Sequence, residues 1–385
     1  MNRTDCIAPE AGTIRRSLGG IETFVPAPLP PAIDYSPRFV LALSRADAVL
    51  SELSGVGRLL PNPHLLISSY LSQEAVLSSR IEGTRASLSD ILLDEVGGFK
   101  QGASGEEDRQ EVRNYVVAME SGIDRLRAGY PISLNLIKEL HRILMFGVRG
   151  ELASPGQFRT IQNWIGPSRS TVEDAIYVPP PPELLLDCLS DWEQFVNAHE
   201  AMPDLVQCAV MHAQFEAIHP FIDGNGRIGR LLISLFLLER NRLSQPLLYL
   251  SAYLERYRSD YYDLLQRIRT HGDWNAWNEF FLIGVEQVAK QAVQQTTDLI
   301  EFREELRTQL HGKPNTVKLI DDLLGNPYLT VARAAKILEK SAPTARVAIA
   351  DLEKRGLLRE ITHGSWRRVY VCQPVLDIIL AATEG

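Results

Sequence analysis

The sequence predicts a mainly helical protein, in which a helical bundle carries a short β-hairpin flap and is followed by a C-terminal winged helix-turn-helix domain. Helical periodicity dominates from about residue 38 to about residue 306. Residues 158–178 interrupt this period with short apolar runs around a polar middle, and four prolines follow. From residue 313 onward, three short helical patterns precede two strand-like runs.

Composition places the chain among ordinary globular proteins. Its 385 residues are 45% hydrophobic and 23% charged with a net charge of −8, and the length suits two or three domains. The apolar runs are too short to span a bilayer, and the N-terminus lacks a secretory signal. The four cysteines lie far apart, which argues against a disulfide framework or a zinc site. We therefore expect a cytoplasmic protein without membrane contact.

The helical part is expected to contain three regions. Residues 1–35, with Gly19-Gly20 and a Pro-rich run, are interpreted as an irregular arm lying on the first domain. Residues 36–110 form an N-terminal helical region, and residues 111–306 form the core with its flap. Helices are expected at Leu66–Ile81, Glu111–Leu126, Leu134–Met145, Leu184–Ala198, Leu205–Ile218, Ile228–Glu239, Tyr257–Arg269 and Trp274–Leu306.

The C-terminal region, residues 313–373, is basic in an otherwise acidic chain. It carries 11 Lys and Arg against 6 Asp and Glu, a net charge of +5. Its order of elements predicts a winged helix. The expected helices and strands are Thr316–Leu324, Val331–Lys340, Thr344–Arg355, Leu358–Thr362 and Arg367–Cys372, with the strands joined at His363-Gly364-Ser365.

A winged helix often binds DNA, with its third helix in the major groove and its wing on phosphates. The third helix here begins with Ser341, Thr344 and Arg346, and the wing carries Trp366, Arg367 and Arg368. The same fold also serves for protein docking or dimerisation. DNA and a second copy of the chain are therefore both open as partners.

The segment from His219 to Arg230 holds the residues of a phosphate site. Gly224-Asn225-Gly226 can turn successive N–H groups toward one point, and the helix that follows adds its own N–H groups and its dipole. Arg227 and Arg230 lie three residues apart and so leave that helix on one side. Cations in a first helical turn oppose the dipole, which indicates that an anion offsets them.

Asp223 and His219 add metal and acid–base chemistry. A carboxylate at position 223 can hold Mg²⁺ against a polyphosphate. Pro220 ends the preceding helix, and the imidazole of His219 can accept a hydroxyl proton at neutral pH. Each feature alone is usually structural, a tight connection or a capping residue. Their occurrence within one short segment favours a phosphate-handling site, and no P-loop motif occurs in the chain.

Residues 219–230 match in full the signature H-x-F-x-[D/E]-G-N-G-R-x-x-R of the Fic family, whose members are protein AMP-transferases of mainly helical fold. The chain resembles this family over about residues 35–300. Further similar runs are Glu111–Tyr115, Ile137–His141 and Arg159–Gly166, the last leading to Val178-Pro179-Pro180-Pro181.

This resemblance implies a protein adenylyltransferase. It would transfer AMP from ATP to a Ser, Thr or Tyr hydroxyl of a target protein, itself included, and release pyrophosphate. His219 would take the hydroxyl proton, and Asp223 would hold Mg²⁺ on the α- and β-phosphates. The other phosphate contacts would come from the backbone of Gly224, Asn225 and Gly226, from the side chains of Asn225 and Arg227, and from Arg230 at the γ-phosphate.

A second motif implies an internal brake. Ser78, Glu82 and Gly83 fit the inhibitory pattern [S/T]-x-x-x-E-[G/N] of the same family, at the end of a helix that spans about residues 66–83. A carboxylate in a last helical turn opposes the dipole and favours a cation from elsewhere. The resemblance implies that Glu82 pairs with Arg230 and occupies the space of the γ-phosphate. A solvated surface glutamate is the alternative.

The flap, residues 158–178, would hold an extended target peptide by backbone hydrogen bonds along an exposed edge. A hairpin that only covers the core is the alternative. Two other functions are also open. The site could remove AMP from a modified protein with Glu82 orienting a water molecule, or the chain could be a DNA-binding regulator whose core senses a nucleotide.

Overall fold

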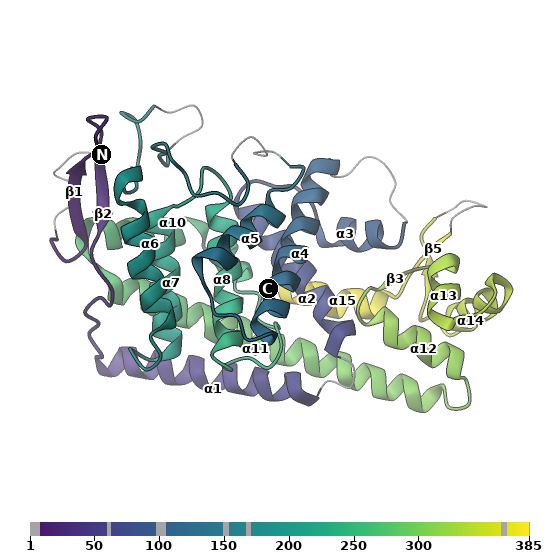
Figure 1. Cartoon of the computed structure of the whole chain (residues 1–385). Helices are drawn as coiled ribbons and strands as arrows, with labels where there is room; N and C mark the ends of the chain where they lie inside the picture. The colour runs from purple at the N-terminus through teal and green to yellow at the C-terminus, as the bar shows by residue number, and fades with distance from the viewer. Residues whose placement is uncertain are drawn as a thin grey trace. The chain divides into compact units, whose positions relative to one another are not determined.

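The computed structural model describes residues 8–59, 63–97, 105–148, 154–166, 171–362 and 368–384. The chain divides into two compact units. The first comprises residues up to 50, 114–242 and 253–287, and the second comprises residues 51–113, 243–252 and those from 288 onward. The mainly helical fold expected from the sequence is confirmed (Figure 1).

The elements in chain order are β1 (Gly12–Arg16), β2 (Glu22–Pro26), α1 (Pro37–Leu59), α2 (Pro63–Ile81), α3 (Leu88–Glu95), α4 (Glu106–Arg127), α5 (Leu134–Leu144), α6 (Pro182–Asn197), α7 (Asp204–Ile218), α8 (Asn225–Glu239), α9 (Ser251–Arg256), α10 (Arg258–His271), α11 (Trp274–Gln309), α12 (Pro314–Leu323), β3 (Tyr328–Thr330), α13 (Val331–Leu338), α14 (Ala342–Lys354), β4 (Arg359–Glu360), β5 (Val369–Val371) and α15 (Gln373–Glu384).

Helices α7 and α8 pack against each other in the first unit, with α6 and α10 against α7 and α5 against α8 (Figure 1). Every residue of α7 from Leu205 to Ile218 is buried, as expected of a helix that is apolar on nearly all faces. Two of its buried polar side chains bond neighbouring elements: the Gln207 amide donates to the Phe195 carbonyl, and the His212 ring bonds the Tyr261 hydroxyl. The loop between α7 and α8 therefore begins and ends on rigid, fully packed helices.

The N-terminal arm is not irregular as expected. From Gly12 to Pro26 it forms an antiparallel hairpin, β1–β2, in full register. Gly19-Gly20 supplies the turn, in which Gly20 adopts a φ of 82° and its N–H donates to the Ser17 carbonyl. The Phe24 N–H donates to the Val178 carbonyl at 2.9 Å, so the hairpin is fastened to the chain just before α6. The flanking strands are too short to show a clear period, so the glycine pair by itself predicts only a loop.

The second unit contains the C-terminal helices and a small antiparallel sheet of order β3–β5–β4. Helices α12, α13 and α14 contact one another, and the expected start of α13 at Thr330 is observed, where the side chain caps the Arg333 N–H. Strand β3 and helix α15 were not expected, because a three-residue strand shows no period. Residues 363–367 of the expected wing lie outside the described residues, and the winged-helix assignment stays a prediction.

None of the helices in the described parts of the chain combines the length and the hydropathy that crossing a membrane requires.

We predict opposite effects for alanine at two helical glycines. A Cβ on Gly284 of α11 would lie 2.5 Å from the Tyr253 ring, which also contacts Phe280, so Gly284→Ala should lower the free energy of unfolding by about 1–3 kcal/mol. Gly55 of α1 has no atom within 4 Å of the added carbon, so Gly55→Ala should raise that free energy by about 0.5–1 kcal/mol. Urea unfolding measures the free energy of unfolding of both variants. A Gly284→Ala protein that is more stable than wild type would contradict the close packing of Gly284 against Tyr253.

Candidate functional site

His219 ends α7 in a strained backbone conformation. It adopts the left-handed region, with φ 50° and ψ 60°, and its N–H still donates to the Phe215 carbonyl. A residue other than glycine pays for this geometry with strain, which persists only where the surroundings enforce it. Pro220 follows directly and cannot continue a helix. The imidazole is thus set at the end of α7, partly exposed, beside the start of the loop.

The guanidinium of Arg159 enforces that end. Its Nε donates to the His219 carbonyl at 2.9 Å, and its Nη2 donates to the carbonyls of Pro180 at 2.6 Å and Ile218 at 3.3 Å. The Arg159 N–H donates to the Pro220 carbonyl. Only 3% of the residue is exposed, and burial lowers its pKa to about 10, so it stays charged at neutral pH. A cation here also complements the negative end of the α7 dipole.

His141 of α5 supports the loop from the other side. Its ring stacks on Phe221 with centroids 3.7 Å apart and planes 2° from parallel. The Gly156 N–H donates to Nδ1 at 2.8 Å, so the proton of the neutral ring lies on Nε2, which donates to the Asp223 carbonyl at 2.9 Å. Burial, reinforced by the charge of Arg227, lowers the pKa of His141 to about 4. His141 is therefore a neutral structural group rather than a base.

Asn225 uses its side chain to close the turn. Its Oδ1 accepts the Phe221 N–H at 2.8 Å, and its Nδ2 donates to the Phe221 carbonyl at 2.9 Å. Asn163 donates to the same carbonyl at 2.8 Å. Since the Asn225 side chain is taken up in this way, we expect its backbone N–H, rather than its amide, to face a phosphate.

The turn places the N-terminus of α8 at the loop. Gly224 adopts φ 78°, and a Cβ there would lie 2.9 Å from the Met145 sulfur, so only glycine fits. The Ile228 N–H makes the first helical hydrogen bond, to the Gly224 carbonyl, and the N–H groups of residues 225–227 precede that ladder. Such a helix N-terminus attracts an anion.

Two buried arginines add positive charge to this N-terminus. Arg227 and Arg230 are 4% and 2% exposed, and Nη2 of Arg227 lies 3.5 Å from the Met145 sulfur. The charge of Arg230 helps to lower the pKa of His212. Arg227 lies in the first turn of α8, where a cation opposes the helix dipole, and Arg230 lies one turn further on. An anion bound at the N-terminus would relieve that repulsion.

Asp223 is the carboxylate at this site that suits a metal ion. Its side chain is exposed, and Oδ1 accepts the Gly224 N–H at 2.6 Å, which orients the second oxygen. No group of three or more His, Cys, Asp or Glu in the described residues could hold a metal ion. A single carboxylate with substrate phosphates is nevertheless a common way to hold Mg²⁺, so Asp223 fits that role.

Comparison with known proteins identifies the family. Residues 131–237 match the Fic/DOC family, and residues 40–124 match the Fic/DOC family N-terminal region. The chain therefore contains a Fic domain preceded by a Fic/DOC N-terminal domain. The signature residues 219–230 thus lie within the matched Fic segment, on the turn and helix described above.

Three curated relatives of this Fic chain carry names that specify an activity. Protein adenylyltransferase fic-1 of Caenorhabditis briggsae is 29% identical over 32% of this chain and 24% of its own length. Protein adenylyltransferase Fic of Culex quinquefasciatus is 29% identical over 44% and 30%. A probable protein adenylyltransferase of Aquifex aeolicus is 25% identical over 50% and 56%. The matches span between a quarter and just over half of these relatives.

Solved structures share the fold of this Fic chain. A Fic family protein from Desulfovibrio desulfuricans G20 superposes with a TM-score of 0.57 at 19% identity, covering 89% of this chain and 98% of that one. Fic-1 from C. elegans superposes with a TM-score of 0.50 at 20% identity, covering 69% and 73%. At these identities the likeness concerns the fold alone.

The expected inhibitory segment lies at the end of α2 in the second unit. The helix ends at Ile81, the Glu82 N–H donates to the Ser79 carbonyl, and Gly83 adopts a φ of 100°. Ser78 is buried and Glu82 is exposed. The next residue, Thr84, donates to Glu111 Oε2 at 2.6 Å, which fastens the turn to α4. The helix ends at Ile81, so Glu82 lies just beyond the last turn in which it was expected, and Gly83 follows with a positive φ. The inhibitory role of these residues stays a prediction.

The flap of this Fic chain pairs less extensively than a hairpin ladder. Residues 167–170 lie outside the described residues, and in the rest a single antiparallel bridge joins Ile165 to Tyr177. The Tyr177 hydroxyl donates to the Ala217 carbonyl, and the Arg269 guanidinium lies 3.9 Å from the Tyr177 ring centroid. These contacts anchor one end of the flap to α7 just before His219.

We predict that the fold loses stability in mild acid through two buried histidines. Burial lowers the pKa of His141 to about 4 and that of His212 to about 3, whereas both take up protons near pH 6.5 when the chain unfolds. The contribution of the two histidines to the free energy of unfolding is full above pH 6.5. It declines as the pH falls toward 4, because the unfolded state then binds more protons than the folded state. Each histidine should therefore lower the free energy of unfolding by about 2 kcal/mol at pH 5.0, relative to neutral pH.

The measurement is urea unfolding at pH 7.5 and 5.0. His141→Phe keeps the ring on Phe221 but cannot titrate, so the loss between the two pH values should fall to about half. His311→Phe, at an exposed histidine, is the matched control and should leave the loss unchanged. If wild type and His141→Phe lose the same unfolding free energy between pH 7.5 and 5.0, the interpretation of His141 as a buried, neutral histidine is wrong.

Proposed function

We propose that this protein transfers AMP from ATP to a hydroxyl side chain of a target protein. The observation that carries the proposal is the juxtaposition of His219, held at the end of α7, with the N-terminus of α8 and its two buried arginines. Acceptor deprotonation and polyphosphate binding require these two groups side by side. The names of the curated relatives support the same reaction class.

The reaction follows from the roles of these groups. The phosphates of ATP lie on the N–H groups at the start of α8, with Arg227 and Arg230 offsetting their charge. His219 takes the proton of the acceptor hydroxyl, and the oxygen attacks the α-phosphorus. The bond from that phosphorus to the β-phosphate oxygen breaks, pyrophosphate leaves, and the proton passes from His219 to solvent. Positioning and charge stabilisation supply most of the rate.

Mg²⁺ bound with ATP would neutralise charge on the phosphates, and Asp223 is the residue that would hold it. The bond from the Gly224 N–H to Asp223 Oδ1 keeps this carboxylate at the edge of the turn. His141 keeps the same residue in place through its carbonyl. Asp223 is therefore oriented through both its backbone and its side chain.

We further propose that Glu82 restrains this activity by pairing with Arg230. Two properties support the pairing. Glu82 is an acid just beyond the C-terminus of α2, where the helix dipole is unfavourable to it. Arg230 is a buried cation in the first turns of α8, where the dipole is also unfavourable. A carboxylate on Arg230 would take the position of the γ-phosphate and misalign the α-phosphate.

The test is incubation of each variant with α-labelled ATP and cell proteins, including the chain itself. Glu82→Gly should raise labelling about tenfold, the increase that corresponds to a coupling of about 1.4 kcal/mol between the carboxylate and the nucleotide site. His219→Ala in the Glu82→Gly background should lower labelling by about 10²–10⁴-fold. His311→Ala is the control at an exposed histidine.

The outcomes separate the two proposals. No labelling by Glu82→Gly, or labelling that survives His219→Ala, would refute AMP transfer at this site. Labelling that depends on His219 but is no faster in Glu82→Gly would refute only the brake. Removal of AMP and DNA-linked nucleotide sensing stay predictions, since no observed contact favours either one.

A further inference from the structure

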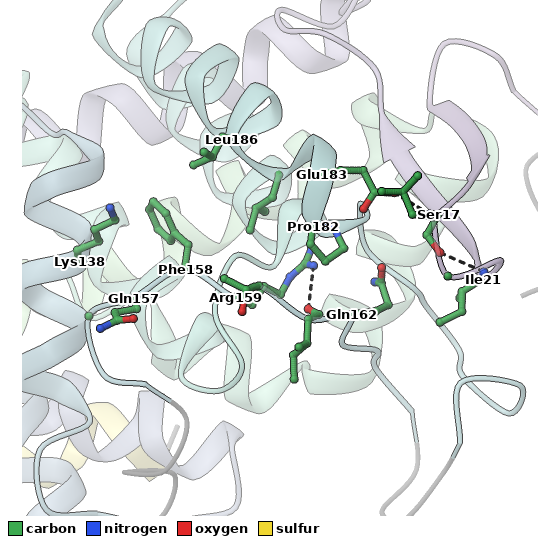
Figure 2. Close-up of a pocket in the computed structure, with 16 residues that line it drawn as sticks. Ser17, Ile21, Lys138, Gln157, Phe158, Arg159, Gln162, Pro182, Glu183 and Leu186 are labelled. Atoms are coloured by element: carbon green, nitrogen blue, oxygen red, sulfur yellow. Dashed lines mark hydrogen bonds between the residues drawn. The ribbon is translucent and has the colours of Figure 1, made fainter.

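A groove of about 900 Å³ lies in the first unit, lined in part by the residues at the start of the flap. The turn between β1 and β2, residues 156–162, and the first turn of α6 form its walls, and Lys138 of α5 lies at its rim. Figure 2 shows Lys138 and Phe158 toward one end and Ser17, Ile21 and Glu183 toward the other. None of the phosphate-site residues lines it, so it is a separate surface.

The groove has the chemical character of a docking surface. Three of its lining side chains are large, apolar and exposed: Leu18 at 91%, Ile161 at 63% and Leu186 at 63%. Apolar side chains gathered around one groove mark a site of interaction, whereas single ones do not. Phe158 adds an aromatic face, over which the Lys138 ammonium lies 4.7 Å from the ring centroid.

Lys138 gives the groove a charged end. Among the described side chains no carboxylate forms an ion pair with it, so its charge is available to a ligand. At the opposite end, Glu183 is already engaged, because its Oε1 accepts the Leu18 N–H at 2.8 Å. The groove thus favours an acidic group at the Lys138 end, next to an apolar stretch.

The hairpin wall of the groove is preformed. The Leu18–Glu183 bond fastens the β-turn to the start of α6, and the turn itself is closed by the Ser17 N–H to the Ile21 carbonyl at 2.8 Å. A wall that is ordered before binding lowers the entropic cost of docking a flexible segment. The N-terminal hairpin therefore serves as a fixed wall.

One lining residue, Arg159, connects the groove to the loop that carries His219. Arg159 lines the groove and, through its backbone and side chain, bonds the carbonyls of Pro220 and His219. A peptide lying in the groove would therefore be close to a residue that holds the loop carrying His219. This continuity favours a target segment over an unrelated ligand, and the inference rests on the proposed function.

We infer that this groove docks an extended segment of the target protein, with an acidic side chain toward Lys138 and large apolar side chains against Leu18, Ile161 and Leu186. It selects targets by sequence, away from the modified hydroxyl. A backbone-paired flap makes few demands on side chains, so the groove supplies specificity that the flap lacks.

The test selects phage-displayed random 12-residue peptides for binding to the His219→Ala variant. This selection measures binding alone and does not depend on AMP transfer. We expect a consensus that combines an acidic residue with apolar ones. The selected peptide should bind Leu186→Asp at least about tenfold more weakly, since apolar anchors carry most of such affinity. Leu41→Asp, at an exposed leucine of α1 in the same unit, should bind it as the parent does.

Lys138→Glu provides a gain-of-specificity arm. Selection against it should replace the acidic position of the consensus by Lys or Arg. Absence of a consensus, binding unaffected by Leu186→Asp, or an acidic consensus retained with Lys138→Glu would each overturn the inference. Melting temperatures of all variants confirm that they are folded.

A final arm keeps this inference distinct from the proposed function. The selected peptide, extended by a flexible linker with one serine, is incubated with Glu82→Gly and labelled ATP. If the peptide binds but is not labelled, the docking inference holds and the result counts against AMP transfer. Labelling that is equal for a peptide with the consensus scrambled would count against the groove alone.

Discussion

The buried guanidinium of Arg159 is the interaction on which the rest of the site depends. It binds the last carbonyls of α7 and the proline turn before α6, and its backbone binds Pro220. Without Arg159, several buried carbonyls would lose their hydrogen-bond donors. The left-handed conformation of His219 would then lose the contacts that stabilise it. The same residue forms the floor of the groove, so one side chain links the phosphate site to the surface on which we place the target.

The loop between α7 and α8 is held by side chains whose polar groups are nearly all committed. Asn225 and Asn163 bond the backbone of Phe221, and His141 bonds Gly156 and the Asp223 carbonyl. Side chains committed in this way cannot bind substrate. The groups left to do so are backbone N–H groups, the Asp223 carboxylate and the arginines. A rigid frame of this kind suits a reaction in which positioning supplies most of the rate.

Charge is distributed in a way that favours a polyphosphate. The chain as a whole is acidic, with a net charge of −8, yet two arginines are buried in the first turns of α8. Nearby histidines are kept neutral by burial, and the arginine charges push their pKa values further down. The site therefore keeps its positive charge on groups that cannot titrate, which suits the role of proton acceptor that we propose for the partly exposed His219.

The sequence alone determined the features that are local. The turn at Gly224, the start of α8 and the end of α7 are encoded within twelve consecutive residues, and the end of α2 at Ile81, just before Gly83, is equally local. Arg159 and His141 lie 60 and 82 residues from the groups they hold, so no periodicity or spacing could connect them to the site. Short strands such as β1 and β3 escaped notice because they become stable only when paired. Only the tertiary structure decided which polar side chains hold the loop in place and which remain for chemistry, because that depends on partners that only folding brings together.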